Sequence, residues 1–396
     1  MTRIHQNLTL NGFAKQLCSE QLGSDLGRVG YKFVSNMLAG IHRTRSVNLT
    51  DIAKGLDENI RLHATHKRLS RNLDNPALAA RLSNRLLRLG AAKVRSDTRL
   101  IVHLNELNKK YARKVEFLPE PGLDSKAGFK VCEIIASDPG SETYTPLLAT
   151  VWSDKVPGYS SDTEEIKKAM HRVARATGGR GMFYFDDHSI DGDSLLPIMK
   201  ESGLNFIVML GGTEIDVLYR NEICSLQTLV ESVETPYGRT MFKLIPEGAA
   251  GTTKNTDIDL FLHAGALAIK LPDCDRSLRL IALKTKNRFV GQIETPMLTS
   301  ESNLRSRKAL MGLVESFLSI QDVLTAHQSL RDSFNPASFR VLTYNRLQLL
   351  MTLLQGVIHY EVAMAGNVSV GEHLFSVTPH DGDINRTYFL PRQQRA

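Results

Sequence analysis

The segments RLIVHL (residues 99–104), FKVCEIIA (residues 129–136) and TPLLATVW (residues 145–152) are short apolar runs within a chain of 396 residues. Each run is rich in Val, Ile and Leu, which is the composition of a β-strand. Three such runs in series predict a sheet. A helix is expected to follow, from about Asp162 to Ala176, because the next residues include Gly178 and Gly179, which end helices.

Two further strands are expected downstream of that helix. The segment GMFYFDD (residues 181–187) predicts a strand whose end carries Asp186 and Asp187. A helix from Ser194 to Glu201 then leads to the apolar strand NFIVML (residues 205–210). A strand, a helix and a strand at this spacing fit a βαβ unit, so the fold class is predicted to be α/β with a mixed sheet flanked by helices.

The remaining pattern divides the chain into five regions. Strand-like segments such as TMFKLI, LRLIALKT and FVGQIE, broken by Gly, Asn and Pro, predict a β-rich insertion. Apolar periodicity predicts two later helical segments, Arg305 to Leu330 and Phe339 to about Ala365. The expected regions are a helical basic region (1–96), the first part of the core (97–210), the insertion (211–300), C-terminal helices that complete the core (301–366) and a tail (367–396).

The first hundred residues carry the positive charge of the chain. They contain 17 Lys or Arg and 7 Asp or Glu, a net charge of +10, whereas the whole chain nets 49 − 42 = +7, which leaves −3 for residues 101–396. A basic segment joined to a nearly neutral body is typical of proteins that bind the phosphate backbone of nucleic acids, although a solvated helical surface has the same composition.

Short helices are expected to carry this charge. The segment NLTDIAKGL (residues 48–56) predicts one helix, capped by Asn48 or Thr50, and ENIRLHATHKRLSRNLDNP (residues 58–76) predicts a second that Pro76 ends. A third is expected from Ala77 to about Leu89. The candidate phosphate-contacting residues lie on the second and third helices, the last three at i, i+4 and i+7 spacing and therefore on one face: Lys67, Arg68, Arg71, Arg81, Arg85 and Arg88.

The composition excludes several classes of protein. Hydrophobic residues make up 42% and charged residues 23% of the chain, which are ordinary values for a globular protein. No run approaches eighteen apolar residues and no secretory signal pattern begins the chain, so no membrane partner and a cytoplasmic location are expected. The four cysteines are far apart in sequence and indicate neither a zinc site nor a redox pair.

Four segments in order carry a resemblance to a known family. They are THKRLSRNL (residues 65–73), HLNELNKKYARKVEFL (residues 103–118), FYFDDHSID (residues 183–191), and SRKALMGLVESFLS (residues 306–319) continued by SFNPASFRVLTYNRLQLLMTLL (residues 333–354). From about Val47 to Ala365 the chain resembles bacterial insertion-sequence transposases of the branch with a Tyr-Arg-Glu-Lys signature. The resemblance implies a DDE catalytic domain with an RNase H-like fold.

In that family three carboxylates hold two divalent cations, about 3.5–4 Å apart, that activate the attacking oxygen and stabilise the leaving oxygen at a phosphodiester. The resemblance aligns the first Asp with His103 and the second with Asp187. Counting back without a gap from Arg340, where the match is closest, the signature falls on Phe317, Ile320, Leu324 and Arg331.

His103 and Leu324 therefore stand where two of the three acids are expected, and imidazole is a poor Mg²⁺ ligand. The resemblance implies an inactive enzyme with weak or no Mg²⁺ binding at Asp187 and no cofactor. The alternative is an active enzyme that uses Mg²⁺ or Mn²⁺ and combines Asp187 with unorthodox acids chosen from Glu106, Asp186, Asp191 and Glu315. Glu315 would serve only if the alignment shifted by nine residues.

Three functions follow from these observations. The first is a transposase-family DNA-binding protein that has lost strand cleavage, binds double-stranded DNA through its basic helices, and lies in the bacterial cytoplasm in association with the nucleoid. The second is the active metal-dependent transposase. The third is an interaction protein that pairs with an intact transposase, or with a second copy of itself, and inhibits transposition.

Overall fold

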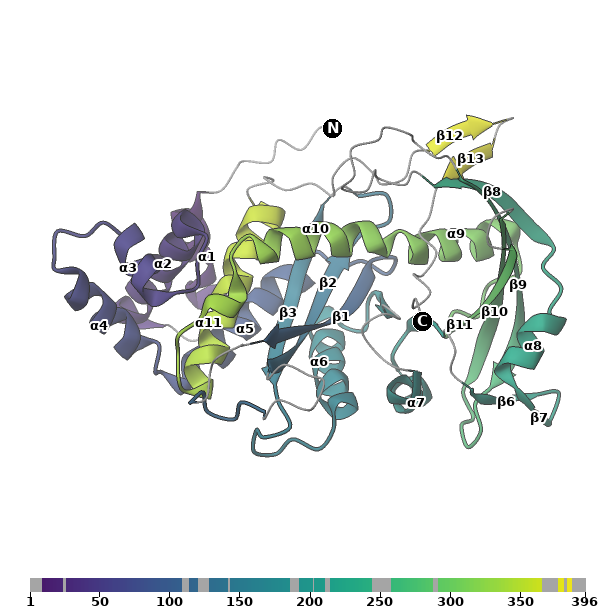
Figure 1. Cartoon of the computed structure of the whole chain (residues 1–396), viewed down its shortest axis with the longest axis horizontal. Coiled ribbons are helices and arrows are strands. Elements are labelled where there is room, and N and C mark those ends of the chain that lie inside the picture. The colour runs from purple at the N-terminus through teal and green to yellow at the C-terminus, as the bar shows by residue number, and fades with distance from the viewer. Residues whose placement is uncertain are drawn as a thin grey trace. The chain divides into compact units, whose positions relative to one another are not determined.

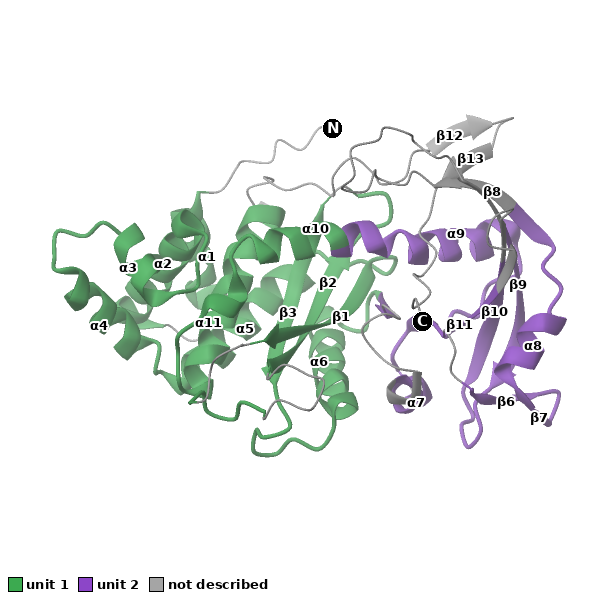
Figure 2. Ribbon diagram, viewed as in Figure 1, with its two compact units in different colours: residues 1–181, 325–369 green, residues 182–324, 370–396 purple. Residues whose placement is uncertain are grey.

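The structure is a computed structural model, and it describes residues 9–23, 26–108, 114–119, 128–141, 143–185, 192–201, 203–210, 214–243, 258–287, 291–364, 377–380 and 383–386. The described residues form a mixed α/β protein, as the sequence predicts. The chain divides into two compact units, Met1–Gly181 with Thr325–Ser369 (unit 1) and Met182–Leu324 with Val370–Ala396 (unit 2), which Figure 2 distinguishes by colour.

Four helices begin unit 1 (Figure 1): α1 (Leu10–Leu17), α2 (Gly27–Thr44), α3 (Leu49–Gly55) and α4 (Leu62–Asn72). Asn48 caps α3 as predicted, because its side chain accepts a hydrogen bond from the Thr50 N–H. Helices α2 and α3 approach closely at Gly40, where a Cβ atom would lie 2.5 Å from the Ile52 side chain. Any larger residue at Gly40 would force these two helices apart.

An ion pair between the exposed Arg45 and the buried Glu361 fastens these helices to the C-terminal part of unit 1. Arg45 ends α2 with left-handed backbone (φ 50), and its Nη1 lies 2.8 Å from the carboxylate of Glu361. Its guanidinium also covers the ring of Phe334, 4.6 Å from the ring centroid. Glu361 lies in the π-helical turn Tyr360–Met364 and is buried; Arg45 balances its charge, and His42 Nε2 lies 3.5 Å from the same carboxylate.

Three antiparallel strands form the sheet of unit 1, and all three were predicted. They are β1 (Arg99–Asn108), β2 (Gly128–Ser137) and β3 (Tyr144–Trp152), with β2 in the middle. The β1–β2 register places His103 opposite Glu133. The apolar residues of these strands are buried, which explains why their sequences read as nearly continuous apolar runs.

Helices α5 (Pro76–Ala91), α6 (Asp162–Thr177) and α11 (Tyr344–His359) pack against this sheet, α5 and α11 on β3 and α6 on both β2 and β3. The predicted helix ends are confirmed: Pro76 is the first residue of α5, and Gly178 ends α6 with left-handed backbone (φ 65). Thirteen of the sixteen residues of α11 are buried, so α11 is the central helix of unit 1.

The helical segment predicted from Arg305 to Leu330 is two helices rather than one. Helix α9 (Arg307–Leu318) ends at Ser319, and α10 (Ile320–Asp332) begins directly after it. A short 3₁₀ turn, Pro336–Ser338, then separates α10 from α11. Helix α11 begins at Tyr344 rather than at the predicted Phe339.

Unit 2 contains the predicted βαβ unit and the predicted β-rich insertion. Strands β4 (Met182–Phe185) and β5 (Phe206–Met209) are parallel, and α7 (Gly192–Lys200) lies between them in the chain. The insertion contains β6 (Asp216–Tyr219), β7 (Glu222–Ser225), β8 (Tyr237–Lys243), β9 (Ile258–Lys270), β10 (Ser277–Asn287) and β11 (Gly291–Thr299).

The strands of unit 2 lie in the order β4-β5-β11-β10-β9-β6-β7, and β8 pairs with the other part of β9. Two features were not predicted. Helix α8 (Leu226–Ser232) interrupts the strands of the insertion, and the tail contains a short hairpin of β12 (Val377–His380) and β13 (Asp383–Arg386).

One helical stretch of the described chain, Arg307–Ser338, is long and apolar enough to cross a membrane by length and composition alone. In its most apolar window 44% of the residues are buried inside the protein. Within this stretch Arg331 forms an ion pair, and His327 a hydrogen bond, with the buried Glu133 of β2. These contacts identify its C-terminal half as a core helix of unit 1.

The core of unit 1 contains an uncharged histidine. His359, the last residue of α11, is fully buried, its Nδ1 lies 3.1 Å from the Pro146 carbonyl oxygen, and its ring stacks on Phe13 at 5.8 Å. Burial lowers the pKa of His359 to about 4, which outweighs the opposite effect of the hydrogen bond to Pro146. At neutral pH this ring is therefore neutral and carries its proton on Nδ1.

We predict that acid destabilises unit 1 through His359. Folding lowers the pKa of His359 from 6.5 to about 4. The part of the unfolding free energy that depends on the neutral ring, about 3 kcal/mol in total, is therefore present above pH 6.5 and is lost as the pH falls through 4. Urea unfolding at several pH values should show a smaller loss of unfolding free energy in His359→Leu than in the natural protein over this range. Replacing the exposed His263 by Gln should leave the pH profile unchanged, and an equal profile in His359→Leu would contradict the prediction.

Candidate functional site

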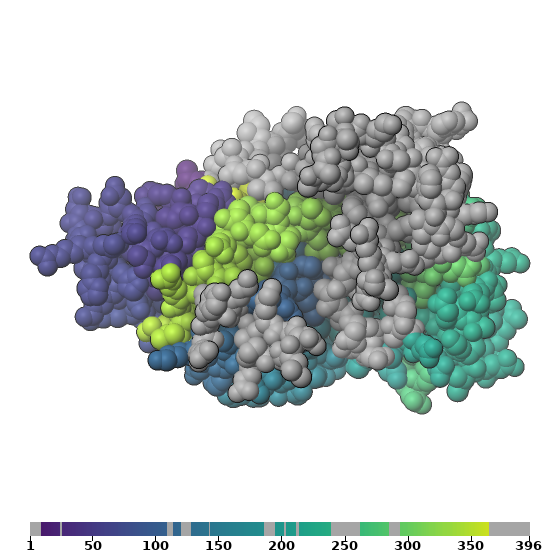
Figure 3. Space-filling view, in the orientation of Figure 1, coloured from purple at the N-terminus to yellow at the C-terminus, as the bar shows by residue number. Residues whose placement is uncertain are grey.

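Helix α4 presents a basic face to solvent. Its buried residues are Thr65 and Leu69, whereas His63, Lys67 and Arg71 are exposed. Lys67 and Arg71 are four residues apart and therefore lie on the same side of the helix. Within the described parts of the chain neither of these two side chains has an ion-pair partner. On the face seen in Figure 3, the N-terminal helices, coloured purple to blue, lie open to solvent.

The connection between α3 and α4 fixes the orientation of α4. Glu58 of this connection accepts hydrogen bonds from the Thr65 hydroxyl (2.9 Å) and, with both carboxylate oxygens, from Arg68 Nη2 (2.7 and 2.8 Å). The hydrogen bond from Arg68 lowers the pKa of Glu58. A short helix followed by a second helix with an exposed basic face is the arrangement by which many helical DNA-binding units reach the major groove.

The prediction for Arg85 is wrong. Arg85 is only 3% exposed, and it donates hydrogen bonds to the carbonyl oxygens of Leu17 (2.8 Å) and Ser19 (2.9 Å). The i, i+4, i+7 spacing does not place Arg81, Arg85 and Arg88 on one exposed face, because α5 turns the side of Arg85 toward the end of α1. Arg85 has a structural role, since it satisfies carbonyl groups that α1 leaves open at its C-terminus.

Two other predicted residues have partners already. The Arg68 guanidinium is bound by Glu58, and Arg88, although exposed, donates a hydrogen bond to the Leu22 carbonyl oxygen (2.9 Å). Among the six predicted residues, the three exposed side chains with no such partner in the described chain are Lys67, Arg71 and Arg81.

His103, at the position predicted for the first catalytic acid, belongs to a buried charge cluster of unit 1. This cluster consists of His103 and Asn105 of β1, Glu133 of β2, and His327 and Arg331 of α10. His327 Nε2 lies 3.2 Å and Arg331 Nε 3.4 Å from the Glu133 carboxylate. Asn105 donates a hydrogen bond to the same carboxylate, and its side-chain oxygen lies 3.1 Å from His103 Nε2.

Electrostatics hold Glu133 in the charged form. Burial by itself raises the pKa of Glu133, but the charges of Arg331 and His327 and the hydrogen bond from His327 outweigh it, so the pKa lies well below its ordinary value. Glu133 is 6% and Arg331 is 5% exposed, so this is an ion pair shielded from water. Its carboxylate oxygens are occupied by Arg331, His327 and the Asn105 amide, so they are not free to bind a metal ion.

The other predicted acids do not join this cluster in the described chain. Glu106 is exposed on β1 and accepts a hydrogen bond from Asn108 (3.0 Å); it lies on the opposite side of the strand from His103. Leu324 is buried, as expected for an apolar replacement. Glu315 is half-buried on α9. Asp186, Asp187 and Asp191 lie outside the described residues. Among described residues no three His, Cys, Asp or Glu side chains come together as possible metal ligands.

The sequence analysis did not single out Glu133 or His327. Glu133 is a lone acid inside the apolar run FKVCEIIA, and an acid buried in a central strand requires a partner of opposite charge. His327 and Arg331 are four residues apart on one face of α10, and this pair of possible partners for a buried acid was the other available indication.

A scan of the chain against protein-family models gave no match, and a search of curated proteins found no similar sequence.

We predict that Glu133→Ala destabilises the protein by about 3–5 kcal/mol, because it leaves Arg331 buried without a counter-charge and His327 without its hydrogen-bond partner. Urea unfolding monitored by circular dichroism measures this loss. Adding Arg331→Met to Glu133→Ala should recover part of it, because the second change removes the unpaired charge.

Glu106→Ala is the matched control for this prediction, since Glu106 is an exposed acid on the neighbouring strand, and its effect should stay within about 0.5 kcal/mol. Equal effects of Glu133→Ala and Glu106→Ala would refute the structural role of the cluster.

Proposed function

We propose that this chain is a DNA-binding protein of the insertion-sequence transposase family that binds double-stranded DNA without cutting it. The observation that carries the proposal is the exposed face of α4, where Lys67 and Arg71 lie one helical turn apart and have no ion-pair partner among the described residues. Exposed cations on one helix face can contact phosphates of a DNA backbone. The net charge of +10 over residues 1–100 favours the same partner.

The order of elements supports the family. Strands β1, β2 and β3 are antiparallel and consecutive, and they are followed in the chain by α6, β4, α7 and β5, with β4 and β5 parallel. This is the element order expected of an RNase H-like core. The β-rich segment between β5 and α9 corresponds to the insertion predicted from the strand-like segments of the sequence.

The loss of cleavage is inferred from the chemistry at the positions aligned with the acids. His103 replaces the first acid, Leu324 the third, and the only acid beside His103 in the described cluster, Glu133, is neutralised by Arg331 and His327. A two-metal mechanism needs several free carboxylates around the cations, and this cluster offers cations and amides instead. A protein that binds DNA in this way would lie in the bacterial cytoplasm with the nucleoid.

We predict that the double variant Lys67→Ala, Arg71→Ala binds a DNA duplex about 10- to 100-fold more weakly at 0.1 M salt, across all sequences. The plot of log affinity against log salt concentration should become shallower by about 2, because two phosphate contacts and their released counterions are lost. Fluorescence anisotropy with a labelled duplex, over a series of salt concentrations, gives both quantities.

The matched control removes two exposed cations of unit 1 outside the helical region, Lys155→Ala and Arg340→Ala, and should preserve both the affinity and the slope. If this control weakened binding as much as the α4 variant, the assignment of the interface to α4 would be wrong.

We further predict no nicking of supercoiled plasmid by the purified protein with either Mg²⁺ or Mn²⁺, at protein concentrations that saturate the DNA. The readout is conversion of supercoiled to open-circular plasmid on an agarose gel. Metal-dependent nicking that disappears in Asp187→Ala would overturn the proposed loss of catalysis and favour the active transposase.

A further inference from the structure

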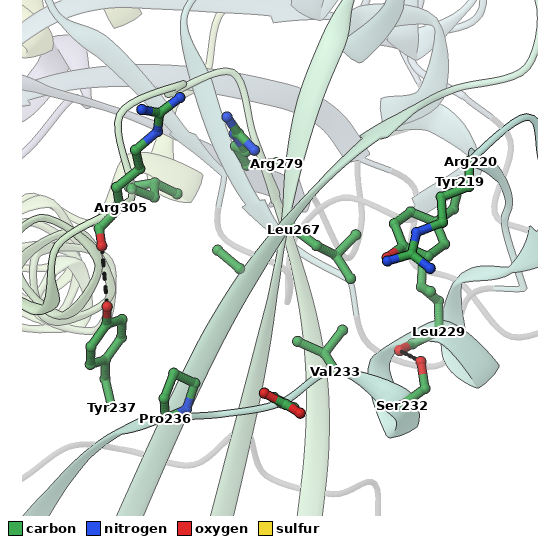
Figure 4. A pocket seen from close by; sticks show the side chains of 13 residues that line it. Tyr219, Arg220, Leu229, Ser232, Val233, Pro236, Tyr237, Leu267, Arg279 and Arg305 are labelled. Carbon is green, nitrogen blue, oxygen red and sulfur yellow. Dashed lines mark hydrogen bonds between the residues drawn. The ribbon is translucent and has the colours of Figure 1, made fainter.

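A pocket in unit 2 gathers three arginine side chains that have no carboxylate partner among the described residues. Its volume of about 540 Å³ is within the range of small-molecule sites. The residues that line it come from the β6–β7 hairpin, α8, the start of β8, β9, β10 and the segment before α9. Figure 4 shows Arg279 and Arg305 toward one end of this pocket, and Arg220 with Tyr219 at another side.

The three arginines are not balanced by acids. Arg220, Arg279 and Arg305 all line the pocket, and within the described residues none of their guanidinium groups has an ion pair with a carboxylate. The one carboxylate of the lining, Glu234, is exposed to solvent. Three positive charges around one concave surface repel each other, and an anion bound among them would relieve that repulsion.

The backbone conformation of Arg220, at the edge of this pocket, is strained. Arg220 and Asn221 form the two-residue turn between β6 and β7, and both have left-handed backbone (φ 51 and φ 69). Asn tolerates this conformation, whereas an arginine in it is strained. The Arg220 guanidinium lies 5.0 Å from the ring centroid of Tyr219, so the charge is held against an aromatic face at the edge of the pocket.

The pocket also contains apolar side chains, beside the polar Ser232, Glu234 and Tyr237. Leu267, Val233 and Leu229 provide apolar side chains, and Leu267 lies near the centre of the view in Figure 4. The Tyr237 hydroxyl donates a hydrogen bond to the Arg305 carbonyl oxygen (3.1 Å), which fixes the backbone that carries Arg305. We call Leu229, Val233 and Leu267 the apolar floor of the pocket. An apolar floor beside guanidinium groups suits a ligand with a flat ring at one end and an anionic group at the other.

We propose that this pocket binds a nucleotide, with its phosphate held by Arg279 and Arg305 and its base on the apolar floor toward Tyr219 and Arg220. Guanidinium groups bind phosphate oxygens in pairs, and arginine and tyrosine side chains both stack on bases. The nucleotide comes either from a free mononucleotide or from a DNA strand. The site lies in unit 2 and is independent of the α4 interface of unit 1.

Isothermal titration of the full-length protein with deoxyadenosine 5′-monophosphate tests the proposal. The double variant Arg279→Ala, Arg305→Ala should lose at least tenfold in affinity, as should replacement of the nucleotide by deoxyadenosine, which lacks the phosphate. Both substituted side chains reach solvent and have no described partner, and a far-ultraviolet circular dichroism spectrum like that of the natural protein checks the fold. Lys308→Ala, an exposed cation close in sequence to Arg305, is the control and should bind normally.

No binding of the nucleotide by the natural protein, or equal binding by the double arginine variant, would overturn the proposal. Inorganic phosphate that binds as tightly as the nucleotide would overturn the role of the apolar floor. A single-stranded oligonucleotide that displaces the nucleotide and binds tenfold more tightly identifies a DNA strand as the source, whereas no displacement identifies a free nucleotide. The variant Lys67→Ala, Arg71→Ala should keep its nucleotide affinity, so failure of this site and failure of the α4 interface are distinguishable.

Discussion

Glu133 is a carboxylate in the middle strand of a sheet from which water is excluded, and it stays charged because Arg331 and His327 face it from α10. A buried charge without a partner is among the most destabilising features that a core can contain, so this cluster fixes where α10 packs on the sheet. It also determines the chemistry beside His103. The carboxylate oxygens are used to balance the protein's own cations, which leaves no described acid there to hold a metal ion.

The elements that the sequence predicted are those whose determinants are local. The strands β1, β2 and β3 follow from their apolar residues, and the start of α3 follows from Asn48, which caps the helix within three residues. The buried charges could not be predicted in this way. Glu133 and His327 are 194 positions apart in the chain, and nothing near either residue identifies the other as its partner.

Arg85 illustrates the same limit for the candidate interface. Its spacing from Arg81 and Arg88 fits a basic helix face, yet its hydrogen-bond acceptors are carbonyl oxygens near residue 17, more than sixty positions away. Helical periodicity gives the direction of a side chain around its own helix and does not reveal what packs against that side. The basic pocket of unit 2 was missed for this reason too, because Arg220, Arg279 and Arg305 come together only through the folded insertion.

Two sets of cations in the described chain differ in environment: Arg85 and Arg331 are buried, paired and structural, whereas Lys67 and Arg71 of α4 are exposed and have no ion-pair partner there. We propose that Lys67 and Arg71 bind DNA, whereas Arg331 occupies the Glu133 carboxylate beside His103 and keeps it from a metal ion. One experiment tests both DNA binding and the loss of cleavage. The protein selects fragments from sheared genomic DNA in Mg²⁺ buffer, and the bound fragments and their ends are then sequenced. The account predicts enriched fragments with ends no different from the input. Recurrent new ends at one sequence, or no enrichment over a protein-free control, would contradict it.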